Sequence, residues 1–348
     1  MRLTLVTSVM LAAGFLGIDI GYYLHLGVGQ WKLIWNQRPI DEVIADEATD
    51  PDIRYQLLLA KQIRAYAIDT LGLEGSDNYT TYCEIGDRPV VWVLSVAPAD
   101  ALEPHRWSYP VIGSAPYRGF FVRSRGEAEL DKFEQRGYDT HLRGVSAFST
   151  IGWFRDPILT PMLKYRAIDL ADVLIHELLH ASIWIEGDAD FNESLATFVG
   201  REGAKRWALE FLEGGADSLA ARDDLRKDRV AYGDLLHGLA TRLDSVYSLD
   251  VSREEKLAAK AHQIETTRKI SGKRAWLTKG YDTPEDWTIN NATLALFRTY
   301  NRETDIFERV LLATGELRQA IAVFEMCEEE LEPEAFLERW LEQNASSK

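Results

Sequence analysis

Residues 176–196 read HELLHASIWIEGDADFNESLA, and this stretch carries the strongest structural and chemical signal in the chain. His176 and His180 are four residues apart, so on an α-helix both imidazoles can point at one ion from the same face. Glu177 lies about 100° around the helix, where its carboxylate can reach a water beside that ion without binding the ion. The spacing therefore predicts a metal-binding helix that also carries a general base.

A third ligand is expected a short distance further on. Hydrolytic zinc sites use three protein ligands and leave a position open for water. Residues 187–190 (GDAD) end the first helix, and a second helix should begin near Asn192, with Asp190 or Asn192 as its N-cap. Glu193 then falls in the first turn, where it could face the two histidines. Taken alone, Glu193 has another explanation, since the helix dipole favours glutamate in a first turn.

The second helix also carries a stripe of small residues at four-residue spacing: Ala196, Gly200 and Ala204. A glycine inside a helix costs about 1 kcal/mol relative to alanine, so Gly200 and Gly203 indicate close packing. We expect two antiparallel helices pressed together, with the three candidate ligands at their contact. The competing interpretation is an ordinary buried helix, because residues 168–185 are apolar almost all round.

The composition restricts the class of protein. The chain has 348 residues, of which 46% are hydrophobic and 27% charged, as in ordinary globular proteins. Its net charge of -16 disfavours a nucleic-acid partner, because phosphate backbones repel an acidic chain. Cys83 and Cys327 form neither a disulfide framework nor a CxxC metal motif, so we interpret both as core residues. A single bridge between them stays open.

Residues 1–20 have the character of a targeting segment. Arg2 precedes an uncharged, mostly apolar run over residues 3–18, as in a secretory signal or signal-anchor. The run is shorter than the roughly 20 residues that span a bilayer. Residues 11–13 (LAA) look like the start of a lipoprotein cleavage box, but Gly14 stands where the lipid-bearing cysteine would be. We therefore expect export or membrane tethering without lipidation; the alternative is a hydrophobic helix packed on the core.

The remaining sequence predicts an α+β, mostly helical fold. Residues 21–348 are expected to form one domain, with a small sheet before the HELLH helix and a long helical hairpin after it. The hairpin is a charged arm at about residues 212–279. The expected strands cover residues 89–96, 119–124 and 145–154, and the expected helices outside the arm cover residues 21–35, 51–73 and 287–311.

The HELLH segment and the Glu193 that follows it resemble zinc metallopeptidases of the HExxH-plus-Glu (gluzincin) kind. The chain more closely resembles a bacterial family of predicted zinc aminopeptidases. The resemblance covers nearly all of the chain after about residue 21. Besides the HELLH region with its NESLA continuation, to residue 204, it is carried by DNYTTY (77–82), PYRGFF (116–121), SAFSTIGWFRDPIL (146–159) and NNATLALFRTY (290–300).

The resemblance implies a zincin-like domain that binds one Zn²⁺ through His176, His180 and Glu193. It further implies hydrolysis of peptide or protein substrates by a metal-activated water, with Glu177 as the general base, on the periplasmic side of the cell envelope. The chain departs from the family at Gly14, which removes the lipidation site. No separate motif for binding a substrate amine is visible, although acidic residues follow the HELLH helix at Glu186, Asp188 and Asp190.

Two further elements are candidates for substrate contact. Tyr300 is the candidate proton or oxyanion donor, supported by Asn291, although an Asn-capped core helix with a packed tyrosine explains the same residues. The fallback donors are Tyr117 and His141. In a second element, Ser149, Gly152 and Trp153 belong to STIGWF (149–154), which suits an edge strand that pairs with an extended peptide. The alternative is a core strand whose aromatic side chains pack under the helix.

The sequence alone is compatible with three different functions. The first is a zinc peptidase. The second is a zincin-fold protein that binds peptides or proteins without cutting them, and the intact Glu177 argues against it, because a binding protein needs no base beside a metal. The third is a structural helical protein whose arm mediates assembly and which holds no metal.

Overall fold

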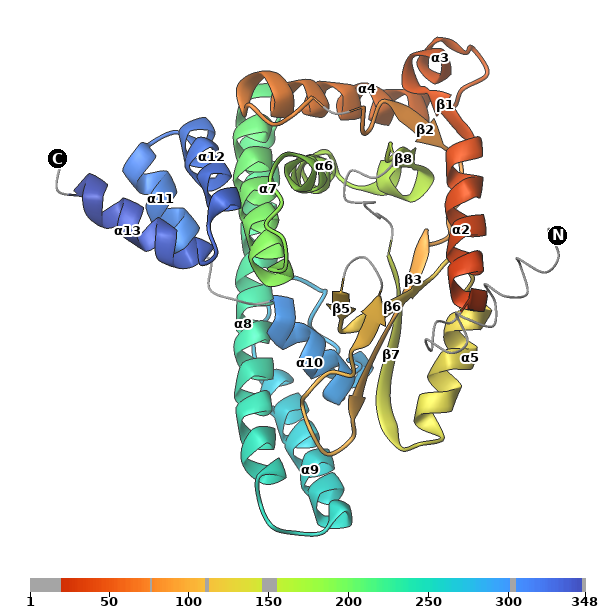
Figure 1. Ribbon diagram of the computed structural model, residues 1–348, viewed down its shortest axis with the longest axis vertical. Helices are drawn as coiled ribbons and strands as arrows, with labels where there is room; N and C mark the ends of the chain where they lie inside the picture. The colour runs from red at the N-terminus through yellow and green to blue at the C-terminus, as the bar shows by residue number, and fades with distance from the viewer. Residues whose placement is uncertain (1–19, 76, 110–112, 146–154, 301–304, 346–348) are drawn as a thin grey trace, which may run out of the picture.

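The computed structural model describes residues 20–75, 77–109, 113–145, 155–300 and 305–345 (Figure 1). Most of these residues are helical and the strands form small sheets, so the predicted α+β, mostly helical class is confirmed. Across these described ranges, no helix combines the length and apolar character that a membrane span requires. The proposed targeting segment, residues 1–20, falls almost wholly outside them.

The helices are α2 (Ile20–Trp35), α3 (Ile40–Ala45), α4 (Pro51–Ala65), α5 (Arg123–Glu134), α6 (Ala167–Ser182), α7 (Ala189–Phe211), α8 (Gly215–Tyr247), α9 (Arg253–Ser271), α10 (Asn291–Tyr300), α11 (Asp305–Thr314), α12 (Leu317–Glu325) and α13 (Pro333–Ala345). The strands are β1 (Gln37–Pro39), β2 (Thr81–Cys83), β3 (Val91–Pro98), β4 (Trp107–Tyr109), β5 (Gly113–Ala115), β6 (Tyr117–Phe120), β7 (Tyr138–Val145) and β8 (Ile158–Leu159).

The largest sheet is built around β3, which pairs antiparallel with β6 on one side and β7 on the other. The sequence predicted β3 within two residues. It extended the second strand too far, because α5 already begins at Arg123. It missed β7, and residues 146–154 of the third predicted strand lie outside the described ranges. A small sheet does precede the HELLH helix.

Helix α6 carries HELLH through the interior of the protein. Its side chains Leu170, Leu174 and Leu178 are fully buried, as the apolar sequence on all sides predicted. In Figure 1, α4 crosses above α6 and α7 runs beside it, while α11, α12 and α13 lie on the other side of α7. Cys83 and Cys327 are buried free thiols, so their interpretation as core residues is confirmed.

The predicted helical hairpin is present as α8 and α9. Ser252 caps α9 in a reciprocal arrangement with Glu255, and Arg242 of α8 donates hydrogen bonds to Gln263 and Thr267 of α9. The hairpin is packed onto the body of the protein, since its apolar side forms a buried cluster with Leu102 and with Leu294 of α10. This packing places α8 and α10 beside the N-terminal end of α7, close to the site described next.

Candidate metal centre

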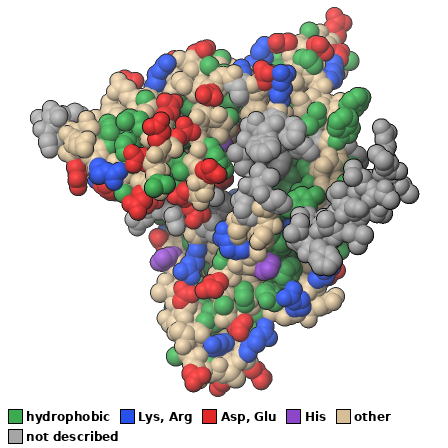
Figure 2. Space-filling view, in the orientation of Figure 1, with side chains coloured by type: hydrophobic (Ala, Val, Ile, Leu, Met, Phe, Trp, Pro, Cys, Tyr) green, Lys and Arg blue, Asp and Glu red, His purple; other side chains and the backbone are tan. Residues whose placement is uncertain are grey.

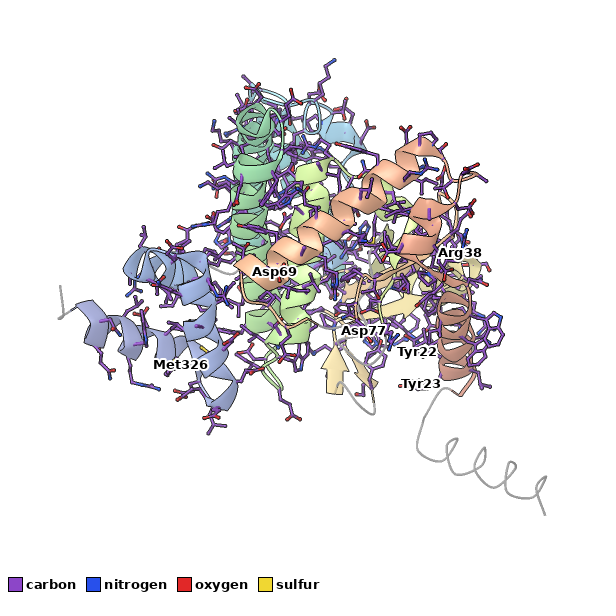
Figure 3. All side chains as sticks on the ribbon, turned by 90° about the horizontal axis from the view of Figure 1, so that it is seen from above. Tyr22, Tyr23, Arg38, Asp69, Asp77 and Met326 are labelled. Carbon is purple, nitrogen blue, oxygen red and sulfur yellow. The ribbon has the colours of Figure 1, made fainter. Side chains whose placement is uncertain are left out.

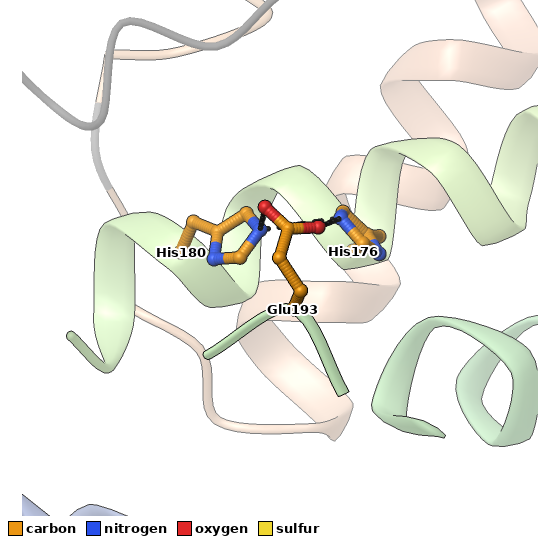
Figure 4. Close-up of side chains that lie close together, drawn as sticks. All are labelled: His176, His180 and Glu193. Carbon is orange, nitrogen blue, oxygen red and sulfur yellow. Dashed lines mark hydrogen bonds and ion pairs between the residues drawn. The ribbon is translucent and has the colours of Figure 1, made fainter. Parts of the chain in front are cut away.

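The three side chains that the sequence selected as ligands lie together (Figure 4). The Nε2 atoms of His176 and His180 are 3.2 Å apart. Each of these nitrogens is 3.7 Å from a different carboxylate oxygen of Glu193. Two helices therefore contribute three ligand side chains that face one point, and this cluster could bind a metal ion.

The spacing of the donors fits zinc. With bonds of about 2.0–2.2 Å, two ligand atoms of a tetrahedral zinc site are separated by about 3.4 Å, and the separations here of 3.2 and 3.7 Å lie on either side of that value. A nitrogen-to-oxygen distance of 3.7 Å is too long for a hydrogen bond. The carboxylate thus faces the imidazoles across a gap of the size that an ion needs.

Burial prepares the two imidazoles as neutral ligands. Desolvation lowers the pKa of His176 to about 4, against the opposing effect of a hydrogen bond to the backbone of Ala196. Desolvation, with a contribution from His176, lowers the pKa of His180 to about 3. Desolvation and then the nearby Asp190 raise the pKa of Glu193. At neutral pH both histidines are therefore uncharged, which is the form that binds a metal.

The lowered pKa values predict a pH-dependent stability for the metal-free protein. An unfolded histidine takes up a proton below about pH 6.5, whereas the folded His176 and His180 do so only near pH 4 and pH 3. The unfolded state binds more protons in that window, so stability falls as the pH drops. Between pH 7 and pH 5.5 we expect these two histidines to lower the free energy of unfolding by about 2 to 3 kcal/mol.

Urea unfolding of chelator-treated protein at several pH values measures this slope. A variant with both residues changed, His176→Gln together with His180→Gln, serves as the control, because other partly buried histidines also titrate. The slope should be shallower in this variant. An unchanged slope would show that the two imidazoles are not buried in a neutral form.

The turn between α6 and α7 determines where Glu193 lies. Gly187 adopts a positive φ of 85°, and the carboxylate of Asp188 accepts a hydrogen bond from the Phe191 backbone, so Asp188 is the N-cap of α7. The predicted cap, Asp190 or Asn192, was wrong by two or four residues. Asn192 is buried and its amide bonds both the N–H and the carbonyl of Ile185. This clamp fixes the chain immediately before Glu193.

The small residues of α7 allow the two helices to approach each other. A Cβ on Gly200 would lie 2.8 Å from the Asp172 carbonyl oxygen and 3.1 Å from the His176 Cβ. In Figure 1, α6 is seen nearly end-on while α7 runs upright, and Figure 3 shows the same region from above. The two helices are inclined to each other, and their contact runs in opposite directions, with Glu193 beside His180 and Gly200 beside Asp172. This agrees with the antiparallel arrangement expected from the sequence. The close contact at Gly200 is as expected.

Gly200→Ala is expected to destabilise the protein by about 2 kcal/mol and to weaken metal binding, because the added methyl group must displace Asp172 or His176. A matched control is Gly238→Ala in α8, where the nearest atom to a new Cβ is the end of Arg242 at 3.4 Å. The control should gain about 0.5–1 kcal/mol from helix propensity. Thermal unfolding of both variants measures the difference, and equal effects would contradict the close packing at Gly200.

Tyr79 is a site residue that the sequence did not identify. It is the one non-glycine residue with positive φ, at 59°, in the described part of the chain, and it is buried. Its backbone N–H donates to the Asp156 carbonyl at 2.7 Å. Burial raises the pKa of Tyr79, and the carboxylates of Glu177 and Asp156 raise it further. A strained backbone beside the expected general base is typical of functional sites. No sequence pattern in residues 77–82 predicts the strained conformation of Tyr79.

The ring of His180 is held by aromatic packing. Trp184 lies edge-to-face with it, at 5.8 Å between ring centres. Within the described residues, the buried Nδ1 atom of His180 has no hydrogen-bond partner. Metal-binding histidines usually donate through this second nitrogen, so His180 is oriented here by packing, whereas His176 also bonds the backbone of Ala196.

The structure describes the surroundings of Asn291, one of the residues expected near the substrate, but not those of the Tyr300 side chain. Asn291 is fully buried, and its amide bonds the carbonyls of Pro98 and Ala101 and the Tyr247 hydroxyl. It therefore holds α10 in place, as the core-helix alternative proposed. Tyr300 ends α10, but its side chain is not described.

The remaining candidates lie elsewhere. Tyr117 on β6 and His141 on β7 are both register partners of Ser95 on β3, so they belong to the sheet. Burial lowers the pKa of His141. Ser149, Gly152 and Trp153 lie outside the described residues, so the edge-strand prediction stays a prediction.

A cavity of about 500 Å³ adjoins the metal-binding cluster. It is lined by the loop of residues 101–104, by Tyr247 and Arg298, and by Asp190 in the first turn of α7. Asp190 lies one helical turn before Glu193 and raises its pKa, so the cavity and the cluster are neighbours. The volume is large enough for one or two amino-acid residues.

Comparison with known proteins places the chain through a family model. No curated protein and no solved structure matches the chain. A family model described as "Putative aminopeptidase" matches residues 21–333, which is most of the chain. The aminopeptidase resemblance seen in the sequence is therefore confirmed at the level of the family, and the chain belongs to the family described as "Putative aminopeptidase".

Proposed function

We propose that the chain is a zinc-dependent aminopeptidase of zincin-like architecture, in which His176, His180 and Glu193 bind one zinc ion. The observation that carries the proposal is the convergence of these three side chains, with donor separations that suit zinc. Membership of the aminopeptidase family supports peptide hydrolysis. The choice of metal and the mechanism depend on the chemistry of the site.

In this proposal Glu177 is the general base. Zinc, when bound, would polarise the scissile carbonyl and make a neighbouring water more acidic. Glu177 follows His176 on α6, so it can take the proton from the attacking water and deliver it to the leaving amine. The surrounding apolar side chains of α6 keep bulk water away from this proton transfer and strengthen the local electrostatics.

The cavity beside Asp190 provides a place for the substrate's N-terminal residue. Its lining includes Glu103, Asp190 and Asp244, and Arg298 is held by Asp244 at 2.9 Å. This excess of carboxylates suits an α-ammonium group next to the scissile bond. The cavity therefore favours an aminopeptidase over an endopeptidase that cleaves within long chains.

The test compares two peptides of identical sequence, one with a free and one with an acetylated N-terminus. A site that recognises the ammonium should prefer the free peptide by about 100-fold or more in kcat/KM. Glu177→Gln protein, prepared in the same way, controls for contaminating peptidases. Equal cleavage of both peptides would exclude an aminopeptidase and point to an endopeptidase.

We further propose that residues 1–20 export or tether the protein at the periplasmic side of the cell envelope. The support is the uncharged run over residues 3–18 after Arg2. Fractionation of cells that express the full chain, with and without these residues, tests this proposal. Recovery of both forms in the cytoplasmic fraction would contradict it.

A further inference from the structure

Helix α2 exposes a continuous apolar stripe. Leu24, Val28, Trp31 and Trp35 are 59%, 57%, 61% and 73% exposed. Their spacing of four, three and four residues places them on one face of the helix. The Trp31 and Trp35 rings stack on each other, with centres 5.4 Å apart and planes 24° apart. We call these four side chains the α2 stripe.

The opposite face of α2 is packed against the body of the protein, so the helix has a fixed orientation. Tyr22 packs edge-to-face on Phe120, and His25 Nε2 accepts a hydrogen bond from the Phe121 backbone at 3.1 Å. A Cβ on Gly29 would lie 2.1 Å from the Phe121 ring, so the two elements are in tight contact there. The outward direction of the stripe is therefore a consequence of the fold.

The stripe lies at the margin of the molecule. In Figure 3, α2 runs along the outer edge between the labelled Tyr22 and Arg38. Figure 2 shows hydrophobic side chains along the edge where Figure 1 places α2. Within residues 20–35, Lys32 is the one residue that is Lys, Arg, Asp or Glu. An exposed apolar surface of this kind marks a contact site, because leaving it in water is unfavourable.

We propose that the α2 stripe lies against the surface of a lipid bilayer. Residues 3–18, which lead into α2, contain no charged side chain and are mostly apolar. A helix with one apolar face lies in the plane of the membrane interface, where tryptophan is enriched. A second copy of this chain is the less suitable occupant, because each copy carries a net charge of -16. The same charge favours a zwitterionic lipid surface over an anionic one.

This contact would orient the protein as well as retain it. Because α2 is fixed to Phe120 and Phe121, a bilayer against the stripe sets the direction in which the body faces. The inference does not depend on the peptidase activity, since it concerns a different surface.

Tryptophan quenching by brominated lipid tests the proposal with the full chain. Residues 1–19 contain no tryptophan, so quenching reports on the rest of the protein. The chain is reconstituted into phosphatidylcholine vesicles with and without bromine on the acyl chains. Brominated lipid should remove up to about a fifth of the emission, because two of the ten tryptophans lie in the stripe. The Trp31→Phe, Trp35→Phe double variant should lose this bromine-dependent quenching.

Two further variants separate lipid contact from other effects. Trp340→Phe, in α13, should keep the bromine-dependent quenching. Leu24→Ser with Val28→Ser retains both tryptophans and should reduce the quenching by weakening the contact. Equal quenching in the parent and the Trp31→Phe, Trp35→Phe variant would overturn the proposal. A different result would also overturn it: the parent forms a dimer in detergent, the Trp31→Phe, Trp35→Phe variant does not, and bromine has no effect on the emission. A second copy of the chain would then be the occupant of the stripe.

Discussion

Glu177→Gln is expected to lower kcat for peptide hydrolysis by about 10³-fold while zinc stays bound. Glutamine keeps the shape of the side chain but cannot accept the proton of the attacking water. Glu177 is not one of the three clustered donors, so the metal-binding geometry of His176, His180 and Glu193 is retained. Steady-state kinetics on a peptide substrate, with zinc measured on the same sample by mass spectrometry, give both quantities.

Glu186→Gln is the matched control for this experiment. Glu186 is exposed in the turn after α6, and its change should leave kcat within about twofold. If Glu177→Gln retained activity close to that of the parent, Glu177 would not be the base. A parent protein that binds zinc and peptide but does not cut would instead support the zincin-fold binding protein.

Glu193→Ala is expected to weaken zinc binding by at least about 100-fold, since one of three protein ligands is removed. The metal-free variant should be as stable as the metal-free parent, because the change removes a carboxylate that lies close to Asp190 and that burial makes harder to ionise. Chelator-competition titration measures the affinity. Thermal unfolding with and without zinc measures the linked stability, which should rise in the parent and much less in the variant.

These two readouts distinguish a metal ligand from a residue with a structural role. A structural glutamate would lower the stability of the metal-free protein when removed, and zinc would stabilise parent and variant equally. Glu193→Gln is the second variant, because it keeps the length of the side chain and the N-terminal turn of α7. It should also bind zinc weakly, and unchanged affinity in both variants would remove Glu193 from the site.

The metal-binding cluster could be predicted from the sequence because it depends on local geometry. The four-residue spacing of His176 and His180 places both on one helical face whatever surrounds the helix. The Gly-Asp turn at residues 187–188 predicted a helix reversal, and Gly200 predicted a close contact. The inclination of α6 to α7 could not be predicted, because it depends on how α4, α8 and α10 pack around them.

Other parts of the site depend on contacts between distant segments. Asp190 or Asn192 was expected to cap α7, but the amide of Asn192 is buried and instead forms hydrogen bonds with both backbone polar groups of Ile185. Asn291 is engaged by Pro98, Ala101 and Tyr247, which lie far from it in the sequence. Tyr79 adopts a left-handed conformation that its own sequence disfavours, so only the tertiary structure places it near Glu177.

X-ray absorption at the zinc K-edge of the zinc-loaded full chain tests the metal centre most directly. We expect one zinc per chain with nitrogen and oxygen neighbours at about 2.0–2.2 Å, including the multiple-scattering signal of two imidazoles. The imidazole signal should fall by half in His180→Gln. A chain that binds no zinc after supplementation, or a zinc with sulfur neighbours at about 2.3 Å from Cys83 or Cys327, would contradict a site formed by His176, His180 and Glu193.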